Sequence, residues 1–281
     1  MLQGILDVFQ FEFMRNALAA GLLVSVACGI IGSYVVVNRI VFISGGIAHS
    51  AYGGIGIGYY FGFNPVIGAI LFSLASAFSM GFVQRKTRLR TDTIIGVMWA
   101  VGMAIGIVFI DKTAGYKVDL MSYLFGSILT VPAGTLWLML LLDAIILALV
   151  AAFYKELLAM SFDETFARIR NVPVDALYYM LLGMIAVTVV MLMRVVGLIL
   201  VIALLTIPAA ISNQWVKNLK SMMVLASFLG MLFTTLGLFL SYWLNLTSGA
   251  TIILVSGTVY ILSALLHHLI TSRQPRQTIP A

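Results

Sequence analysis

Charged residues are scarce in this chain, and their scarcity excludes most soluble folds. Of its 281 residues, 9% are charged and 62% are hydrophobic, whereas soluble domains carry about 25% charged residues. A soluble fold of this size cannot hide so much apolar surface from water. Lipid is therefore the expected solvent for most of the chain. We therefore expect a multi-pass membrane protein that forms one domain over residues 1–281, with no separate soluble module.

Cysteine is nearly absent, and a nucleotide-binding loop is missing. Cys28 is the single cysteine, so no disulfide can form within the chain. No GxxxxGK[ST] loop occurs, and the nearest approach, Gly81 to Thr87, lacks the second glycine. Any ATP hydrolysis must come from a partner chain, and we expect neither an enzyme nor a tightly bound cofactor. Acidic residues, Asp7 and Glu12, stand where a cleaved signal peptide would be basic.

The net charge of +6 comes from basic residues that gather between apolar runs. This placement is typical of cytoplasmic loops in a membrane protein and argues against nucleic-acid binding. The clusters are Arg85, Lys86, Arg88 and Arg90; Lys217 and Lys220; and Arg273 and Arg276. Loops 39–41, 84–92, 155–175 and 216–220 and the C-terminal tail are therefore expected inside, and loop 111–119 and the N-terminus outside.

The apolar runs predict an all-α polytopic transmembrane bundle of about eight to nine spans, because one span needs about 20 apolar residues. The residues before Phe13 are short and amphipathic and are expected at the interface. Segment 120–131 is too short to span and is predicted to be a half-helix or re-entrant element packed inside the protein. The predicted spans are 14–38, 42–61, 65–83, 93–111, 133–154, 176–193, 196–216, 220–244 and 249–269.

Two ionisable residues fall within predicted spans. Intramembrane ionisable groups are costly and face a cavity or a partner. His49 carries an imidazole suited to zinc and similar ions, or it is held structurally by a helix carbonyl, Ser44 or Ser50. Asp143, whose charge costs about 2.5–3.5 kcal/mol at a span centre, serves either as a transient cation contact or in a structural pair.

Glycines and one proline mark helices that pack closely or bend. Gly45 and Gly46 open a glycine-rich second span, which favours either tight helix packing or a helix that bends to open a path. Pro208 removes one helix hydrogen bond, and the freed carbonyl either faces a path or is satisfied by a hydroxyl such as that of Thr206.

The longest non-apolar stretch, 155–175, predicts a short amphipathic helix. Ser161 and Asp163 are both suitable N-caps, and Glu164 completes a capping box with Ser161. The helix is expected to end at Arg168 or Ile169, before Asn171 and Pro173. Phe162, Phe166 and Ile169 would share one face. Such a helix lies on the membrane surface or docks into a groove of a partner.

Four stretches together resemble the permease subunits of metal ABC importers for zinc, manganese or iron, the ABC-3 family. The resemblance covers most of the chain in the expected order. The stretches are FMRNALAAGLLVSVACGIIGSYVVVNRIVFISGGIAHSAYGG (13–54), SFDETFARIRNVP (161–173), RVVGLILVIALLTIPAA (194–210) and LNLTSGATIILVSG (244–257).

The resemblance implies a prokaryotic inner-membrane protein in which two copies enclose a path for a divalent metal ion. It implies an external metal-binding protein and a cytoplasmic ATP-binding subunit that docks on the coupling segment, about 155–175. Many family members carry an aspartate four residues before the histidine, and here that position is Gly45. The implied coupling residues are Phe162, Asp163, Glu164, Phe166, Arg168 and Ile169, and the implied path or gate helices include Ser44, Gly45, Gly46, Thr206 and Pro208.

Two other functions remain open at the level of the sequence. One is a permease of the same architecture for a larger chelate or cofactor such as cobalamin or haem. The other is a secondary metal transporter driven by an ion gradient, for which internal inverted repeats and more buried charges would be typical.

Overall fold

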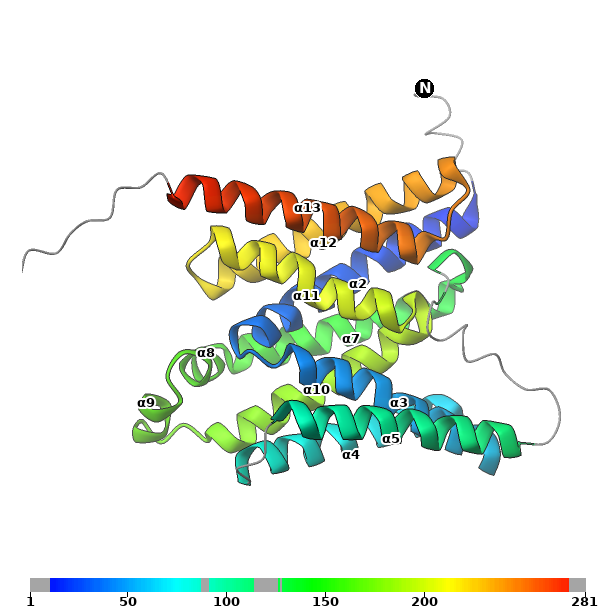
Figure 1. Ribbon diagram of the computed structural model, residues 1–281, viewed down its shortest axis with the longest axis horizontal. Coiled ribbons are helices and arrows are strands. Elements are labelled where there is room, and N and C mark those ends of the chain that lie inside the picture. Colours follow the sequence, from blue (N-terminus) through cyan, green and yellow to red (C-terminus); the bar gives the residue numbers. More distant parts are fainter. Residues whose placement is uncertain (1–10, 87–90, 114–125, 127, 273–281) are drawn as a thin grey trace, which may run out of the picture.

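The chain forms a bundle of long helices in the computed structural model, which describes residues 11–86, 91–113, 126 and 128–272. Within these ranges nine helices have 18 residues or more and run roughly parallel to one another (Figure 1). They are α2 (Glu12–Val37), α3 (Val41–Phe61), α4 (Pro65–Lys86), α5 (Thr91–Lys112), α7 (Ala133–Ala152), α10 (Val174–Val196), α11 (Leu198–Trp215), α12 (Leu219–Leu244) and α13 (Ser248–Ser272). The short elements are η1 (Ile128–Thr130), α8 (Tyr154–Phe162) and α9 (Glu164–Ile169).

Eight of these nine helices are long and apolar enough to cross a membrane, which confirms the predicted all-α membrane bundle. The remaining long helix of the described ranges is α3, whose glycines, serines and His49 lower its hydropathy. Every α3 residue from Ile43 to Gly56 is buried, so protein rather than lipid surrounds this stretch. Polar groups are tolerated at membrane depth where protein covers them. The predicted span 42–61 is therefore an interior helix.

Glycines bring α3 into backbone contact with two neighbours. A Cβ added at Gly54 would lie 2.0 Å from the carbonyl oxygen of Gly68 in α4, and one at Gly56 would lie 2.3 Å from that of Gly106 in α5. Small residues allow such approaches where lipid supplies no hydrophobic drive for association. We call α3, α4 and α5 the α3–α5 unit, because these contacts leave the three helices little freedom to move separately.

Basic residues gather at one end of the bundle, the end where α8 and α9 lie in Figure 1. The described residues of the predicted loops 39–41, 84–92, 155–175 and 216–220 all fall at this end, and α13 also finishes there. Arg15, Lys112 and Arg194 belong to helix termini at the opposite end. The basic residues of the first end are Arg39, Arg85, Lys86, Lys155, Arg168, Arg170, Lys217 and Lys220.

The structure refines several predicted boundaries. The predicted break near residue 196 is at Gly197, whose φ of +83° is unfavourable for other residues. Of the predicted half-helix 120–131, residues 120–125 and 127 lie outside the described residues, and the remainder forms η1, with Ile128 buried against α2. The predicted amphipathic segment before Phe13 also lies outside them, except for its last residues.

The contact between α3 and α4 gives a stability prediction. Gly54→Ala places a methyl group against the Gly68 backbone, which cannot move aside as a side chain would. We expect the variant to lose about 1–3 kcal/mol of stability, the usual cost of overpacking, seen as a lower melting temperature in detergent. The control is Gly96→Ala in α5, where an added Cβ meets nothing within 4 Å. Equal melting temperatures for the two variants would contradict the backbone contact.

Candidate functional site

His49 lies on α3 with its ring stacked on Trp99 of α5. The ring centroids are 3.8 Å apart and the planes are inclined by 15°. The side chain is 9% exposed, and its Nδ1 has no hydrogen-bond partner among the described residues. Ser44 and Ser50, the predicted structural partners, instead donate to carbonyl oxygens of their own helix. The imidazole is therefore held by stacking, and its nitrogens are not committed to either serine.

Gly45 and Gly46 differ in their surroundings although both are buried. A Cβ at Gly46 would lie 2.7 Å from Cγ2 of Ile95, so this glycine serves helix packing. A Cβ at Gly45 would meet nothing within 4 Å. Gly45 is one helical turn before His49 and shares its face. The structure therefore leaves unfilled space beside the imidazole, at the position where the resemblance implies a carboxylate.

Asp143 is on α7 and is not brought together with His49. The side chain is 6% exposed, and its Oδ2 has no hydrogen-bond partner among the described atoms. It is close enough to Cys28 of α2 for an electrostatic interaction, whereas α3 packs mainly against α4 and α5. Across the described ranges, no three His, Cys, Asp or Glu residues gather into a possible metal site. Any cation contact made by this chain at His49 is thus sparsely liganded.

Pro208 lies inside α11, and the helix continues through it to Trp215. The hydroxyl of Thr206 donates to the carbonyls of Ile202 (2.8 Å) and Ala203 (3.3 Å). Proline at 208 removes the bond to the carbonyl four residues earlier, which is that of Leu204. Of the two alternatives for the freed carbonyl, satisfaction by Thr206 is not observed, because its hydroxyl donates to the carbonyls of Ile202 and Ala203.

The coupling segment contains two short helices rather than one. Residues 155–160, for which no helix is predicted, belong to α8, and α9 follows after Asp163. The Asp163 carboxylate caps α9 by accepting from the Phe166 amide at 2.9 Å. Ser161 is not the cap, because its hydroxyl accepts from Asn38 Nδ2 at 3.0 Å and so links α8 to the end of α2. The predicted end at Ile169 is confirmed.

The apolar side chains of this segment are open to their surroundings. Phe162 is 64% exposed, Phe166 51% and Ile169 74%. Phe162 ends α8, so the predicted shared face on one helix reduces to Phe166 and Ile169 on α9. The guanidinium of Arg170 lies 5.4 Å from the centre of the Phe166 ring. Hydrogen bonds to Asp175 and Glu164 raise the pKa of Arg168 above its ordinary value.

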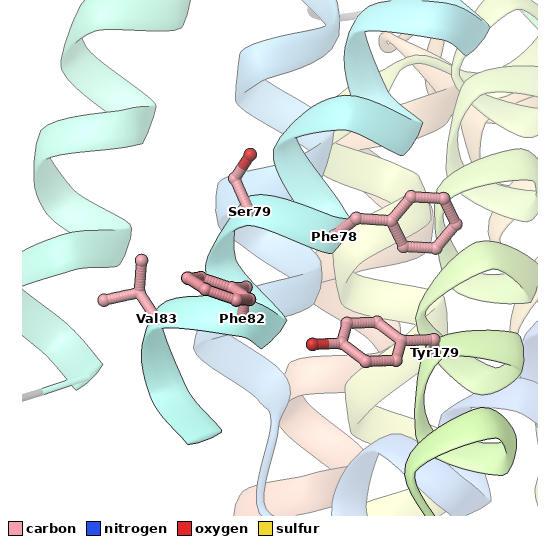
Figure 2. A pocket seen from close by; sticks show the side chains of 5 residues that line it. All are labelled: Phe78, Ser79, Phe82, Val83 and Tyr179. Carbon is pink, nitrogen blue, oxygen red and sulfur yellow. The ribbon is translucent and has the colours of Figure 1, made fainter. Parts of the chain in front are cut away.

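A hollow of about 640 Å³ lies between α4 and Tyr179 of α10. Figure 2 shows Phe78 and Phe82 on the side of α4 nearer Tyr179, with Ser79 and Val83 turned away. Phe78 meets Tyr179 edge to face, with centroids 5.9 Å apart. No lining residue carries a carboxylate, imidazole or thiol. The hollow is therefore suited to apolar chains and not to an ion.

Comparison with known proteins places this architecture among transporter subunits. Residues 10–267 match the ABC 3 transport family. An uncharacterized membrane protein of Synechocystis sp. is 60% identical, with 94% of each chain covered. The manganese transport system membrane protein MntC of Listeria monocytogenes is 35% identical, with 94% of this chain and 93% of that protein covered.

Solved structures agree with these relatives. PsaBC from Streptococcus pneumoniae in complex with Fab matches with a TM-score of 0.84 and 32% identity, over 94% of this chain and 95% of that chain. A putative metal-chelate type ABC transporter in an inward-facing conformation matches with a TM-score of 0.67 over 90% and 86%. Its 17% identity shows a shared fold alone.

The fold and the matches define a multi-pass bacterial membrane protein, the permease type of subunit that contains no ATPase of its own. The chain belongs to the ABC 3 transport family. The family resemblance read from the sequence is confirmed. Membership in an ABC family also means that ATP hydrolysis by a partner, rather than an ion gradient, drives the transporter, so the secondary-transporter alternative is not retained.

The stacking of His49 on Trp99 gives a prediction that needs no transport assay. Trp99→Ala removes the ring that covers the imidazole, so diethyl pyrocarbonate should modify His49 several-fold faster in the purified protein. Peptide mass spectrometry measures the rate at each histidine. The partly exposed His267 serves as the internal control, because its own ring neighbour is Trp215. An unchanged rate at His49 would contradict the stacked arrangement.

Proposed function

We propose that this chain is the membrane-spanning permease subunit of an ATP-driven importer for divalent transition-metal ions. Manganese is the cargo that the names of its relatives favour, because the Listeria relative belongs to a manganese transport system. The observation that carries the proposal is the fold shared with PsaBC over nearly the whole chain, together with the exposed coupling helix at the basic end of the bundle.

The partner proposed for α9 is a cytoplasmic ATP-binding subunit. Basic loops are retained on the cytoplasmic side of membrane proteins, and α9 lies at the end where the basic residues gather. Exposed aromatic side chains on a short helix are typical anchors for a groove in a partner protein. ATP binding would draw two coupling helices together and rock the two bundles between outward-open and inward-open states.

The proposed path runs between two copies of the chain, past His49. One imidazole is a weak site, because transition metals usually take three or four ligands. Weak ligation suits conduction, since an ion held tightly in the path would leave slowly. An extracytoplasmic binding protein would select and deliver the ion. Because the selection would then occur outside the membrane, the permease would need no closed coordination shell.

The surroundings of His49 do not favour the larger-chelate alternative. A cofactor such as haem would need a wide cavity on the path, whereas His49 is covered by Trp99. The metal-chelate type relative shares the fold at an identity too low to carry its cargo over to this chain.

Docking of α9 is tested by Phe166→Ala. A buried aromatic anchor typically accounts for about 2 kcal/mol of binding, so we expect association with the ATP-binding subunit to fall about thirty-fold. Metal uptake should be lost at equal permease level. The control is Trp243→Ala, which removes an exposed ring from the last turn of α12, at the end of the bundle opposite to α9 (Figure 1). Normal association and uptake in Phe166→Ala would place α9 on the membrane surface instead.

The path is tested by His49→Ala, measured as Mn²⁺ uptake into proteoliposomes that contain the assembled transporter. We expect uptake to fall several-fold while assembly is retained, because the path loses its imidazole. Asp143→Asn should have the same effect if the carboxylate contacts the ion. His267→Ala, at the exposed end of α13, is the matched histidine control. Unchanged uptake in His49→Ala would remove this residue from the path.

A further inference from the structure

Four charged side chains connect three helices at the basic end of the bundle. Arg85 ends α4, Glu164 and Arg168 are on α9, and Asp175 is in the first turn of α10. Arg85 Nη1 lies 3.2 Å from Glu164 Oε1 and also contacts Asp175. Arg168 Nη2 lies 2.8 Å from Glu164 Oε1 and 2.9 Å from Asp175 Oδ1. We call these four residues the Arg85 network.

Arg85 is the shielded member of the network. Its side chain is 17% exposed, whereas those of the other three are 47–57% exposed. The Arg85 guanidinium lies 4.2 Å from the centre of the Tyr178 ring in α10, and the Tyr178 hydroxyl donates to Gln84 Oε1 of α4. Exposed ion pairs add little to stability. The main contribution of this arrangement is therefore to hold the end of α4 in a fixed position against α9 and α10.

The helix that ends at Arg85, α4, also contacts the helix that carries His49. α4 is in backbone contact with α3 at Gly54 and Gly68, and α3 is in backbone contact with α5. His49 and Trp99 belong to this α3–α5 unit. α9 packs otherwise against α8 and α10. The contact of Arg85 with Glu164 is thus a direct side-chain link from the coupling helix to the helices that hold His49.

The two carboxylates of the network each have a second basic partner besides Arg85. Arg168 contacts both carboxylates, so Glu164 and Asp175 keep a basic partner if Arg85 moves away. A hollow of about 710 Å³ borders all four side chains and gives them room to move. Contacts that can be broken on one side while the carboxylates stay paired allow a local movement to be passed on.

We propose that Arg85 is a positioning residue that transmits movement of α9 to the α3–α5 unit, and thereby to His49. The inference rests on the proposed function, because it takes α9 as the docking element of the ATP-binding subunit. Arg85 itself need not touch the ATP-binding subunit or the ion. Its loss should uncouple ATP hydrolysis from transport rather than prevent assembly.

The experiment measures Mn²⁺ uptake and ATP hydrolysis in proteoliposomes that contain the permease with its ATP-binding subunit. For Arg85→Gln we expect normal co-purification of that subunit and continued hydrolysis, with ions transported per ATP reduced about tenfold. A merely structural role would lower assembly and both rates together. Lys86→Gln is the matched control, because it removes one positive charge from the adjacent residue. The Lys86 ammonium group lies over the Phe82 ring of its own helix.

Glu164→Gln is the second variant, because it breaks the same link from an exposed residue whose replacement does not threaten folding. It should reduce ions transported per ATP as Arg85→Gln does. A normal ratio in either variant, with the ATP-binding subunit still bound, overturns the role of Arg85. Phe166→Ala in parallel separates the two proposals: if it loses the subunit while both network variants transport normally, docking stands and the transmission through Arg85 does not.

Discussion

Direct backbone contact between α3 and its neighbours is the constraint on which the rest of this bundle depends. α3 carries the imidazole of the proposed path but is the one long helix of the described chain that does not reach the hydropathy expected of a membrane span. It can sit at membrane depth because protein surrounds it, and protein can surround it closely because glycines at 54, 56, 68 and 106 remove the side chains that would intervene. The stacking of His49 on Trp99 follows from the same close approach of α5.

These contacts also connect the two ends of the proposed mechanism. The unit that holds His49 extends to the basic end of the bundle through α4, whose last turn meets α9. An ATP-binding subunit and a metal ion would therefore act on one group of closely packed helices, although they bind far apart along the chain. Such a group responds to force by shifting as a body, because its interior cannot be compressed.

Much of the fold could be predicted from the sequence, because membrane depth imposes a length and an apolar composition on each span. The predicted spans correspond to the observed long helices, and Asn171 and Pro173 end α9 where the backbone chemistry requires it. Helix α8 was missed because Lys155 and Glu156 made an amphipathic extension of α7 look like a loop. The choice of Asp163 over Ser161 as cap depended on a tertiary contact, since Asn38 engages the serine.

The candidate site was less predictable, for a physical reason. Periodicity gives the face of its own helix on which a residue lies, but not the neighbouring helix that this face meets. The stacking partner of His49, and the separation of Asp143 from His49, therefore follow only from the three-dimensional packing. The sequence feature that could have pointed to Trp99 is the presence of a tryptophan inside a predicted span. The family resemblance implies the coupling role of α9, and the exposed apolar side chains of Phe166 and Ile169 are consistent with it.

The unfilled space beside Gly45 has an evolutionary consequence. A side chain at this position would meet no neighbouring helix within the reach of its first carbon, so the bundle tolerates change there without repacking. A single glycine-to-aspartate replacement, one nucleotide away for half of the glycine codons, would set a carboxylate one turn from an imidazole. If the ion passes His49 as proposed, Gly45 is a position where a second ligand can be added with no neighbouring atom within 4 Å of its Cβ, and the desolvation of the new carboxylate is then the main cost.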